Sequence, residues 1–215
     1  MDTTLTLVIA TRNRNKTLEI RDLLKDFPIT IKNLDDFGPI PEVEEDGETF
    51  DENAYKKSSF TARVLGVPAL ADDSGLCVEA LNGAPGVLSA RYAGENATDP
   101  ENCALLLENL KGEKNRNASF KCVISLAVPT GAALTYEGSC DGIILDKPQG
   151  FNGFGYDPLF FFPAFGKTFA ELGLSEKSHV SHRGKALREF RAEFEQVIKW
   201  LNLQMPVVEK FPCKE

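Results

Sequence analysis

The segment Leu5-Thr6-Leu7-Val8-Ile9-Ala10, followed by Thr11-Arg12-Asn13-Arg14-Asn15-Lys16, decides the fold class. Its first six residues form a nearly continuous apolar run rich in β-formers, which is typical of a strand buried on both faces of its sheet. From Lys16 onward, apolar residues recur at helical spacing and stop before Pro28, which cannot continue a helix interior. A buried strand, a polar loop and a helix in succession indicate an α/β protein.

Working outward, the same signals predict further strands and helices. Apolar runs predict strands at 29–34 and 69–71, the second followed by a polar turn at 72–75. Two longer runs, 119–128 and 134–145, flank Pro129-Thr130-Gly131 and predict an antiparallel hairpin. Helices are expected over 50–65 and 98–110, and a last one is expected where an apolar stripe runs from Leu187 to Leu201. The sheet is therefore predicted to be mixed.

Composition limits the classes of protein and partner. The chain has 215 residues with 42% hydrophobic and 26% charged, as in ordinary globular proteins, and a net charge of −8. This balance disfavours binding to a nucleic-acid polymer or an anionic membrane. The sequence shows no bilayer-spanning run, no secretion signal, and five scattered cysteines without a C-x-x-C pair. We therefore predict a cytoplasmic protein with a single domain at 1–203 and a C-terminal tail at 204–215.

The polar loop from Thr11 to Lys16 is a candidate phosphate site. Its hydroxyl, amide and cationic side chains precede a helix N-terminus, where free N–H groups and the helix dipole favour anions. The six candidate residues are Thr11, Arg12, Asn13, Arg14, Asn15 and Lys16. Neither a Walker loop nor G-x-G-x-x-G is present. The alternative is a helix cap whose cations are solvated.

Two acidic segments form a candidate metal site. Glu44 lies in the run 42–48, and Asp72-Asp73-Ser74-Gly75 follows a predicted strand. Carboxylates from separate segments could share one hard divalent cation such as Mg²⁺. The alternatives are a solvated acidic face for the run, and for the aspartates a turn in which they bond only local N–H groups.

Two further segments could bind the rest of a nucleotide. Residues 151–158 interleave glycines with aromatics, which would let a base stack on a ring, although the same pattern fits a glycine-rich turn with core aromatics. Residues 177–184 contain both histidines, His179 and His182, beside Lys177 and Arg183. These cationic groups could bind an anion or a base edge, whereas zinc is disfavoured because no cysteine or third histidine accompanies them.

Together these segments resemble the inosine/xanthosine triphosphate pyrophosphatase family over roughly residues 5–201. The resemblance rests on an ordered set of short motifs: T-x-N-x-x-K at 11–16, T-F-x-E-N-A at 49–54, A-D-D-S-G-L at 71–76, G-A-P-G-V-x-S-A-R-Y at 83–92, G-F-G-Y-D-P at 153–158 and S-H-R-G at 181–184. The chain departs from the family by carrying Arg12 and Asn15 where small residues are usual.

The resemblance implies an elongated mixed sheet flanked by helices, two lobes around a central nucleotide-binding cleft, and a homodimer. It implies that Asp73 is the general base and a Mg²⁺ ligand, with Glu44, or the adjacent Glu45 in a shifted alignment, as the second acidic ligand. Thr11, Asn13 and Lys16 would hold the triphosphate, with Ser74 next to the substrate. The remaining substrate-binding residues would be Phe154, Gly155, Tyr156, Asp157, Lys177, His182 and Arg183.

The implied reaction is the hydrolysis of ITP, dITP and XTP to the nucleoside monophosphate and pyrophosphate. Asp73 would deprotonate a water that attacks the α-phosphorus. Two alternatives remain open from the sequence. One is a nucleotide-binding module whose carboxylates do not position water. The other is a different metal-dependent hydrolase, such as a phosphatase or a pyrophosphatase for modified pyrimidines.

Overall fold

The computed structural model describes residues 5–205, and its strands form one mixed sheet of seven strands in the order β2-β1-β3-β4-β5-β6-β7. β1 pairs in parallel with β2 and β3, and every other neighbouring pair is antiparallel. The strands are β1 Leu5–Ile9, β2 Ile29–Asn33, β3 Ala69–Val78, β4 Asn117–Ala127, β5 Ala133–Ile144, β6 Phe160–Phe162 and β7 Lys167–Thr168. The predicted mixed sheet and the hairpin, which is β4 and β5, are confirmed.

Six α-helices flank this sheet, and their ends follow local signals in the sequence. They are α1 Arg14–Leu24, α2 Phe50–Leu65, α3 Asp99–Asn109, α4 Leu174–Val180, α5 His182–Ala192 and α6 Phe194–Gln204. Thr49 and Glu52 form a capping box at the start of α2, and Gly66 ends the helix in the left-handed region at φ 68°. No helix in residues 5–205 is long and apolar enough to cross a membrane.

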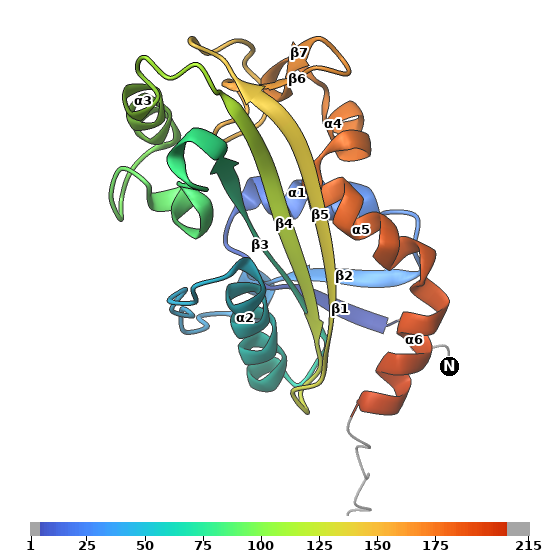
Figure 1. Ribbon diagram of the computed structural model, residues 1–215. Helices are drawn as coiled ribbons and strands as arrows, with labels where there is room; N and C mark the ends of the chain where they lie inside the picture. Colours follow the sequence, from blue (N-terminus) through green and yellow to red (C-terminus); the bar gives the residue numbers. More distant parts are fainter. Residues whose placement is uncertain (1–4, 206–215) are drawn as a thin grey trace, which may run out of the picture.

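Three apolar clusters hold the layers together. One lies between the sheet and helices α1, α5 and α6, and includes Ile20, Leu70 and Leu187. A second, smaller cluster packs α2 on the opposite side, with Ala62 against Ala71 and other small residues. The third cluster lies between α3 and the ends of β4, β5 and β6. Figure 1 shows β4 and β5 running the length of the molecule and joining the part that contains α3, β6 and β7 to the part that contains α2, β1 and β2.

Two predicted elements differ from the structure. Residues 72–75 are not a turn, because β3 continues through them and pairs in register with β4 as far as Val78. The last helix is not continuous, because the backbone at Glu193 leaves the helical region, with φ −100° and ψ 12°, and separates α5 from α6. Both helices bury their apolar residues in the same cluster, so the stripe continues across the break. Of the predicted tail, residues 206–215 lie outside the described part.

An open edge of β3 positions the candidate site. β1 pairs with β3 only at Ala69 and Leu70, and the chain then leaves the sheet at Ala10 to enter the polar loop before α1. From Ala71 onward, β3 therefore has β4 on one side and no strand on the other. The pocket described below opens along this edge, at the end of a parallel strand, where α/β proteins commonly bind ligands.

Candidate active site

Consecutive aspartates on β3 point to opposite faces of the sheet, as the strand period of two requires. Asp72 is buried on the side of α1 and α5, where its Oδ2 accepts hydrogen bonds from Arg183 at 2.8 Å and from Ser74 at 3.0 Å. Asp73 is buried on the side of α2, where its Oδ1 accepts a 2.8 Å hydrogen bond from Lys57. The two carboxylates therefore belong to separate charge clusters.

The loop before α1 is shaped by its own side chains. Asn13 caps the helix by accepting hydrogen bonds from the main-chain N–H groups of Asn15 and Lys16, and Thr11 accepts one from Asn13. Lys16 points back toward β3, with Nζ 3.2 Å from Asp72. Arg14 and Asn15 are exposed and lie outside the pocket lining. The loop thus directs Lys16, but not Arg14, toward the pocket.

A lysine joins two carboxylates on the α2 side of the pocket. Lys57 Nζ lies 2.8 Å from Asp73 Oδ1 and 2.9 Å from Glu45 Oε2. Burial raises the pKa of Asp73 to about 6 despite the Lys57 ammonium beside it. Burial acts the same way on Glu45, but there the Lys57 charge prevails and its pKa is lowered. One carboxylate is therefore firmly ionised and the other titrates close to neutrality.

A second cluster of buried charges lies at the wall of the pocket. Glu19 of α1 accepts hydrogen bonds from Lys177, at 2.8 Å, and from Arg183. Lys177 also donates to Asp157 at 2.6 Å, and Arg183 also donates to Asp72. Burial favours the neutral form of Asp72, but the nearby Lys16 and Arg183 charges hold its pKa well below the ordinary value. Every cation of this cluster has two anionic partners, as buried charges require.

Aromatic rings line the other end of the pocket. The Lys177 ammonium lies 4.8 Å from the centre of the Phe154 ring, in cation–π geometry. The His182 ring stacks on Phe120 with centroids 4.8 Å apart, and burial together with the Arg183 charge lowers its pKa well below 6.5. His182 is therefore neutral at pH 7. Its buried Nδ1 has no hydrogen-bond partner within residues 5–205.

These groups enclose one pocket of about 270 Å³. It joins the polar loop, the open edge of β3, the glycine-aromatic loop before β6 and the start of α5. Of the residues predicted from the sequence, the pocket is lined by Thr11, Arg12, Asn13, Lys16, Asp73, Ser74, Phe154, Gly155, Tyr156, Asp157, Lys177, His182 and Arg183. Glu44 differs from its prediction: it is exposed and outside the lining, whereas the adjacent Glu45 lies in it.

A scan against protein-family models matches the Ham1 family over residues 7–193. This chain belongs to the Ham1 family. The protein named dITP/XTP pyrophosphatase from Desulfotalea psychrophila is 61% identical over 208 residues, which are 97% of this chain and 92% of that relative. A second protein of the same name, from Syntrophobacter fumaroxidans, is 63% identical over 91% of this chain and 84% of its own.

Solved structures of Ham1 proteins have the same fold. The structure of a HAM1 protein from Coxiella burnetii is 45% identical and superposes with a TM-score of 0.83, covering 90% of this chain and all of the other. The Ham1 protein of Staphylococcus aureus is 41% identical with a TM-score of 0.80, over 89% of this chain and 99% of its own. The resemblance inferred from the motifs is confirmed.

Three residues in or near the pocket were not among the site residues predicted from the sequence, although two of them occupy unusual positions in their helices. Lys57 lies at helical spacing from Ala54 and Thr61, on the buried face of α2, where a lysine is unexpected without a partner. Glu19 likewise precedes the buried Ile20 in α1. Arg91, which belongs to the motif at 83–92, also lines the pocket. It pairs with Glu95 at 3.7 Å and donates a hydrogen bond to a main-chain carbonyl, a contact that no sequence pattern identifies. Lys57 and Glu19 could have been predicted as site residues because each is a charged residue on the apolar face of its helix.

The pocket's donors suit a hard divalent cation. Glu45 and Asp73 place two carboxylate oxygens within 2.9 Å of one cationic nitrogen, that of Lys57. Mg²⁺ is commonly held by one or two carboxylates together with substrate phosphates, and does not need an all-protein cage. No group of three His, Cys, Asp or Glu side chains converges in residues 5–205. His179 is exposed, with Nδ1 2.8 Å from the Ser175 carbonyl oxygen, away from His182 in the pocket.

Proposed function

We propose that this chain is a nucleoside-triphosphate pyrophosphatase that hydrolyses ITP, dITP and XTP to the monophosphate and pyrophosphate. One observation carries the proposal: the Glu45 and Asp73 carboxylates converge on a single cation beside a phosphate-type loop, in a pocket whose far end is aromatic. The activity also appears in the names of its Ham1 relatives, dITP/XTP pyrophosphatase. The residues at the two ends of the pocket indicate how such a substrate would lie in it.

The triphosphate would lie against the loop before α1. Thr11 and Asn13 offer polar groups there, and Lys16 offers a positive charge that is only partly used by Asp72 at 3.2 Å. The base would lie at the far end, on the Phe154 ring and near Lys177 and His182. Ring stacking contributes about 1–3 kcal/mol per base without selecting among bases. Stacking therefore adds affinity at the base end of the pocket, and selection among bases needs further contacts there.

Asp73 is the proposed general base. It accepts a proton from a water molecule whose oxygen attacks the α-phosphorus, and the bond from the α-phosphorus to the bridging oxygen breaks to release pyrophosphate. Lys57 holds the Asp73 carboxylate in place from the α2 side. Glu45 and Asp73 would hold Mg²⁺, which would offset phosphate charge and polarise the phosphoryl group. Glu45 takes the ligand role predicted for Glu44, because Glu45 faces Asp73 across Lys57.

Selection of the base would depend on hydrogen-bond donors. Lys177 and Arg183 carry only donors, and His182 lies beside them in the pocket lining. A carbonyl oxygen at purine position 6, as in hypoxanthine and xanthine, would accept from these groups. The adenine amino group would leave a donor unpaired, at about 1–3 kcal/mol per group. ATP is therefore a poor substrate in this proposal.

The decisive experiment compares the wild type with Asp73→Asn on ITP, XTP, dITP, GTP and ATP, with Mg²⁺ or EDTA. We expect pyrophosphate release from ITP to fall about 10²–10⁴-fold in the variant while ITP binding survives. Asp51→Asn, in the exposed first turn of α2, is the matched control and should keep full activity. Unchanged turnover in Asp73→Asn would leave only a nucleotide-binding module. Diphosphate and phosphate as products would indicate a different hydrolase.

Three further points belong to the proposal. A cytoplasmic location, where the nucleotide pool lies, is supported by the free thiols of Cys77, Cys103, Cys122 and Cys140. A single catalytic domain at 1–203 is supported by the one sheet that all seven strands form. A homodimer is expected from the family resemblance, and sedimentation equilibrium of the full chain would test it.

A further inference from the structure

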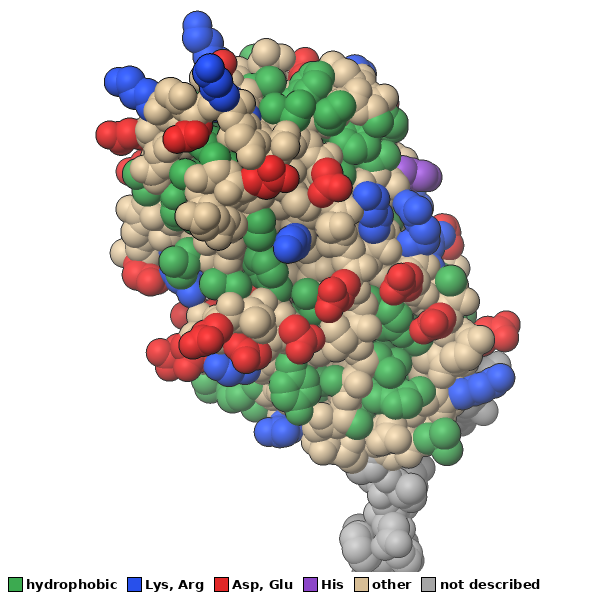
Figure 2. Space-filling view, viewed as in Figure 1, with side chains coloured by type: hydrophobic (Ala, Val, Ile, Leu, Met, Phe, Trp, Pro, Cys, Tyr) green, Lys and Arg blue, Asp and Glu red, His purple; other side chains and the backbone are tan. Residues whose placement is uncertain are grey.

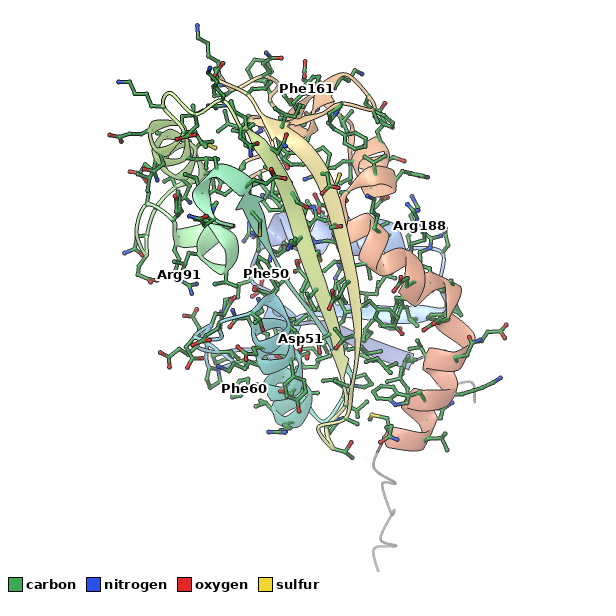
Figure 3. The ribbon with its side chains drawn as sticks, in the orientation of Figure 1. Phe50, Asp51, Phe60, Arg91, Phe161 and Arg188 are labelled. Carbon is green, nitrogen blue, oxygen red and sulfur yellow. The ribbon has the colours of Figure 1, made fainter. Side chains whose placement is uncertain are left out.

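Arg91 lies at the end of the 3₁₀ helix η3 (Gly86–Arg91) and lines the pocket without a role in the proposal above. Its Nη2 donates a 2.8 Å hydrogen bond to the main-chain carbonyl of Glu45. In Figure 3, Arg91 is labelled between the short helices that follow β3 and the loop that precedes α2. The side chain therefore ties the segment carrying η3 to the segment carrying a proposed metal ligand.

The loop that carries Glu45 is held in place by hydrogen bonds to other segments of the chain. Residues 39–47 have no helix or strand, and the space-filling view shows acidic side chains gathered over this part of the surface (Figure 2). The loop is anchored at Ile40, whose carbonyl accepts a 2.7 Å hydrogen bond from Arg12, and at Gly47, which is bonded through both N and O to a side chain of α2. Between these anchors, the Glu45 and Asp46 side chains pair with Lys57 and Lys56 of α2. The Glu45 main chain receives one hydrogen bond within residues 5–205, the one from Arg91.

Hydrogen bonds fix the main chain on both sides of Arg91. The Asn102 side chain donates to the carbonyl of Ala90 at 3.1 Å and accepts from the N–H of Ala93 at 2.8 Å, so it brackets Arg91 in the chain. Two residues earlier, the buried Ser89 hydroxyl accepts a 2.9 Å hydrogen bond from a main-chain N–H of β3. Because Ser89 is bonded to β3, the strand that carries Asp73, these contacts fix the Arg91 donor relative to β3. The bond from Arg91 then fixes the loop relative to Asp73.

We propose that Arg91 is a positioning residue that holds Glu45 opposite Asp73 and thereby sets the affinity of this carboxylate pair for a divalent cation. The inference rests on the proposed function, which assigns the pair to the metal. Without the Arg91 donor, the loop between Ile40 and Gly47 gains conformational freedom that metal binding must then remove. Outer partners that fix metal ligands typically change affinity about 10–100-fold.

Manganese binding without nucleotide tests this inference directly. Free Mn²⁺ is counted by electron paramagnetic resonance during titration of the full chain. For Arg91→Met, which keeps the apolar stem but no donor, we expect the Mn²⁺ dissociation constant to rise about tenfold. Arg91→Gln tests the loss with a second side chain should the first variant fold poorly. Arg91→Lys, which retains a donor, should recover part of the affinity.

Arg188 provides the matched control. It also donates a 2.8 Å hydrogen bond to a main-chain carbonyl, that of His179, but from α5 on the other side of β4 and β5 (Figure 3). Arg188→Met should leave Mn²⁺ affinity within twofold of the wild type. In a Glu45→Gln background, Arg91→Met should cause no further loss, because the ligand that it positions is already absent.

The outcomes separate this inference from the proposed function. Wild-type hydrolysis of ITP to the monophosphate and pyrophosphate, with Mn²⁺ affinity weakened by Glu45→Gln, supports the function and its metal pair. If Arg91→Met then keeps wild-type Mn²⁺ affinity, the positioning role alone is wrong. The same holds if Mn²⁺ affinity is unchanged while KM for ITP rises tenfold at saturating metal, since Arg91 would then contact the substrate itself.

Discussion

Replacing Glu19 by glutamine should destabilise the protein by about 3 kcal/mol, although Glu19 is not expected to touch the substrate. The change removes one charge and keeps the shape, so Lys177 and Arg183 each lose one of two anionic partners. Removing one partner from a buried ion pair generally costs 3–5 kcal/mol. The lower end applies here because Lys177 retains Asp157 at 2.6 Å and Arg183 retains Asp72 at 2.8 Å.

Urea unfolding at pH 7 measures this change in the free energy of unfolding, with an unchanged m-value as evidence that the two states are comparable. For a chain of this length, about 3 kcal/mol corresponds to a fall in Tm of roughly 6–12 °C. Asp26→Asn is the control, because its pair with Arg191 is 3.8 Å long and its side chain is 68% exposed. Such pairs contribute about 0–1 kcal/mol.

The pH dependence sharpens the test. Burial opposes ionisation of Glu19, but the Arg183 and Lys177 charges lower its pKa below the ordinary 4.5. A carboxylate with a lowered folded-state pKa stabilises the protein above the unfolded-state pKa, and this contribution is lost as the pH falls through the folded-state pKa. The difference between wild type and Glu19→Gln should thus be constant from pH 6 to 8 and shrink below about pH 4.5. A difference under about 1 kcal/mol at pH 7 would refute the view that these charges form one interdependent cluster.

Three further changes test other parts of the site. In the metal-free protein, the side-chain carboxyl carbon of Asp73 should titrate near pH 6 by nuclear magnetic resonance, because burial raises its pKa; a midpoint below 4 would contradict this. Tyr156→Phe removes a buried 2.9 Å hydrogen bond to the Ser89 carbonyl and should lower the free energy of unfolding by about 1–3 kcal/mol in chemical denaturation, unless a water replaces the hydroxyl. Gly138→Ala should destabilise by about 1–3 kcal/mol and weaken ITP binding in calorimetry, because the added methyl would meet the main-chain oxygen of His182 at 2.2 Å; full affinity would show that α5 can shift freely.

Elements governed by local signals were predictable. Helix α2 has the predicted ends, since its capping box and its terminal glycine lie within the segment itself. The path of β3 through Asp72-Asp73-Ser74-Gly75 was not, because these residues are poor strand formers. They remain extended because β4 pairs with them and because cations from α1, α2 and α5 neutralise the aspartates. These partners are distant in sequence, so no local pattern predicts them.

The candidate site was predictable to the extent that its chemistry lies in short motifs. The residues of the loop before α1, of 153–158 and of 181–184 were identified by residue type together with the family resemblance, and most of them line one pocket. The choice between Glu44 and Glu45 stayed open, because an irregular loop gives no periodicity from which to decide which carboxylate faces the pocket. Lys57 and Glu19 act through partners that only the folded chain brings together.

The alternation along β3 has a consequence for how this sequence can change. Asp72 and Asp73 differ by one position and face opposite layers, so deleting or inserting a single residue between Ala69 and Asp72 would turn each of them to the opposite face of the sheet. An insertion would place Asp72 beside Lys57, and a deletion would place Asp73, the proposed base, beside Arg183. Loops around the pocket can vary in length without this effect. The short stretch from Ala69 to Asp73 is thus expected to keep a fixed length.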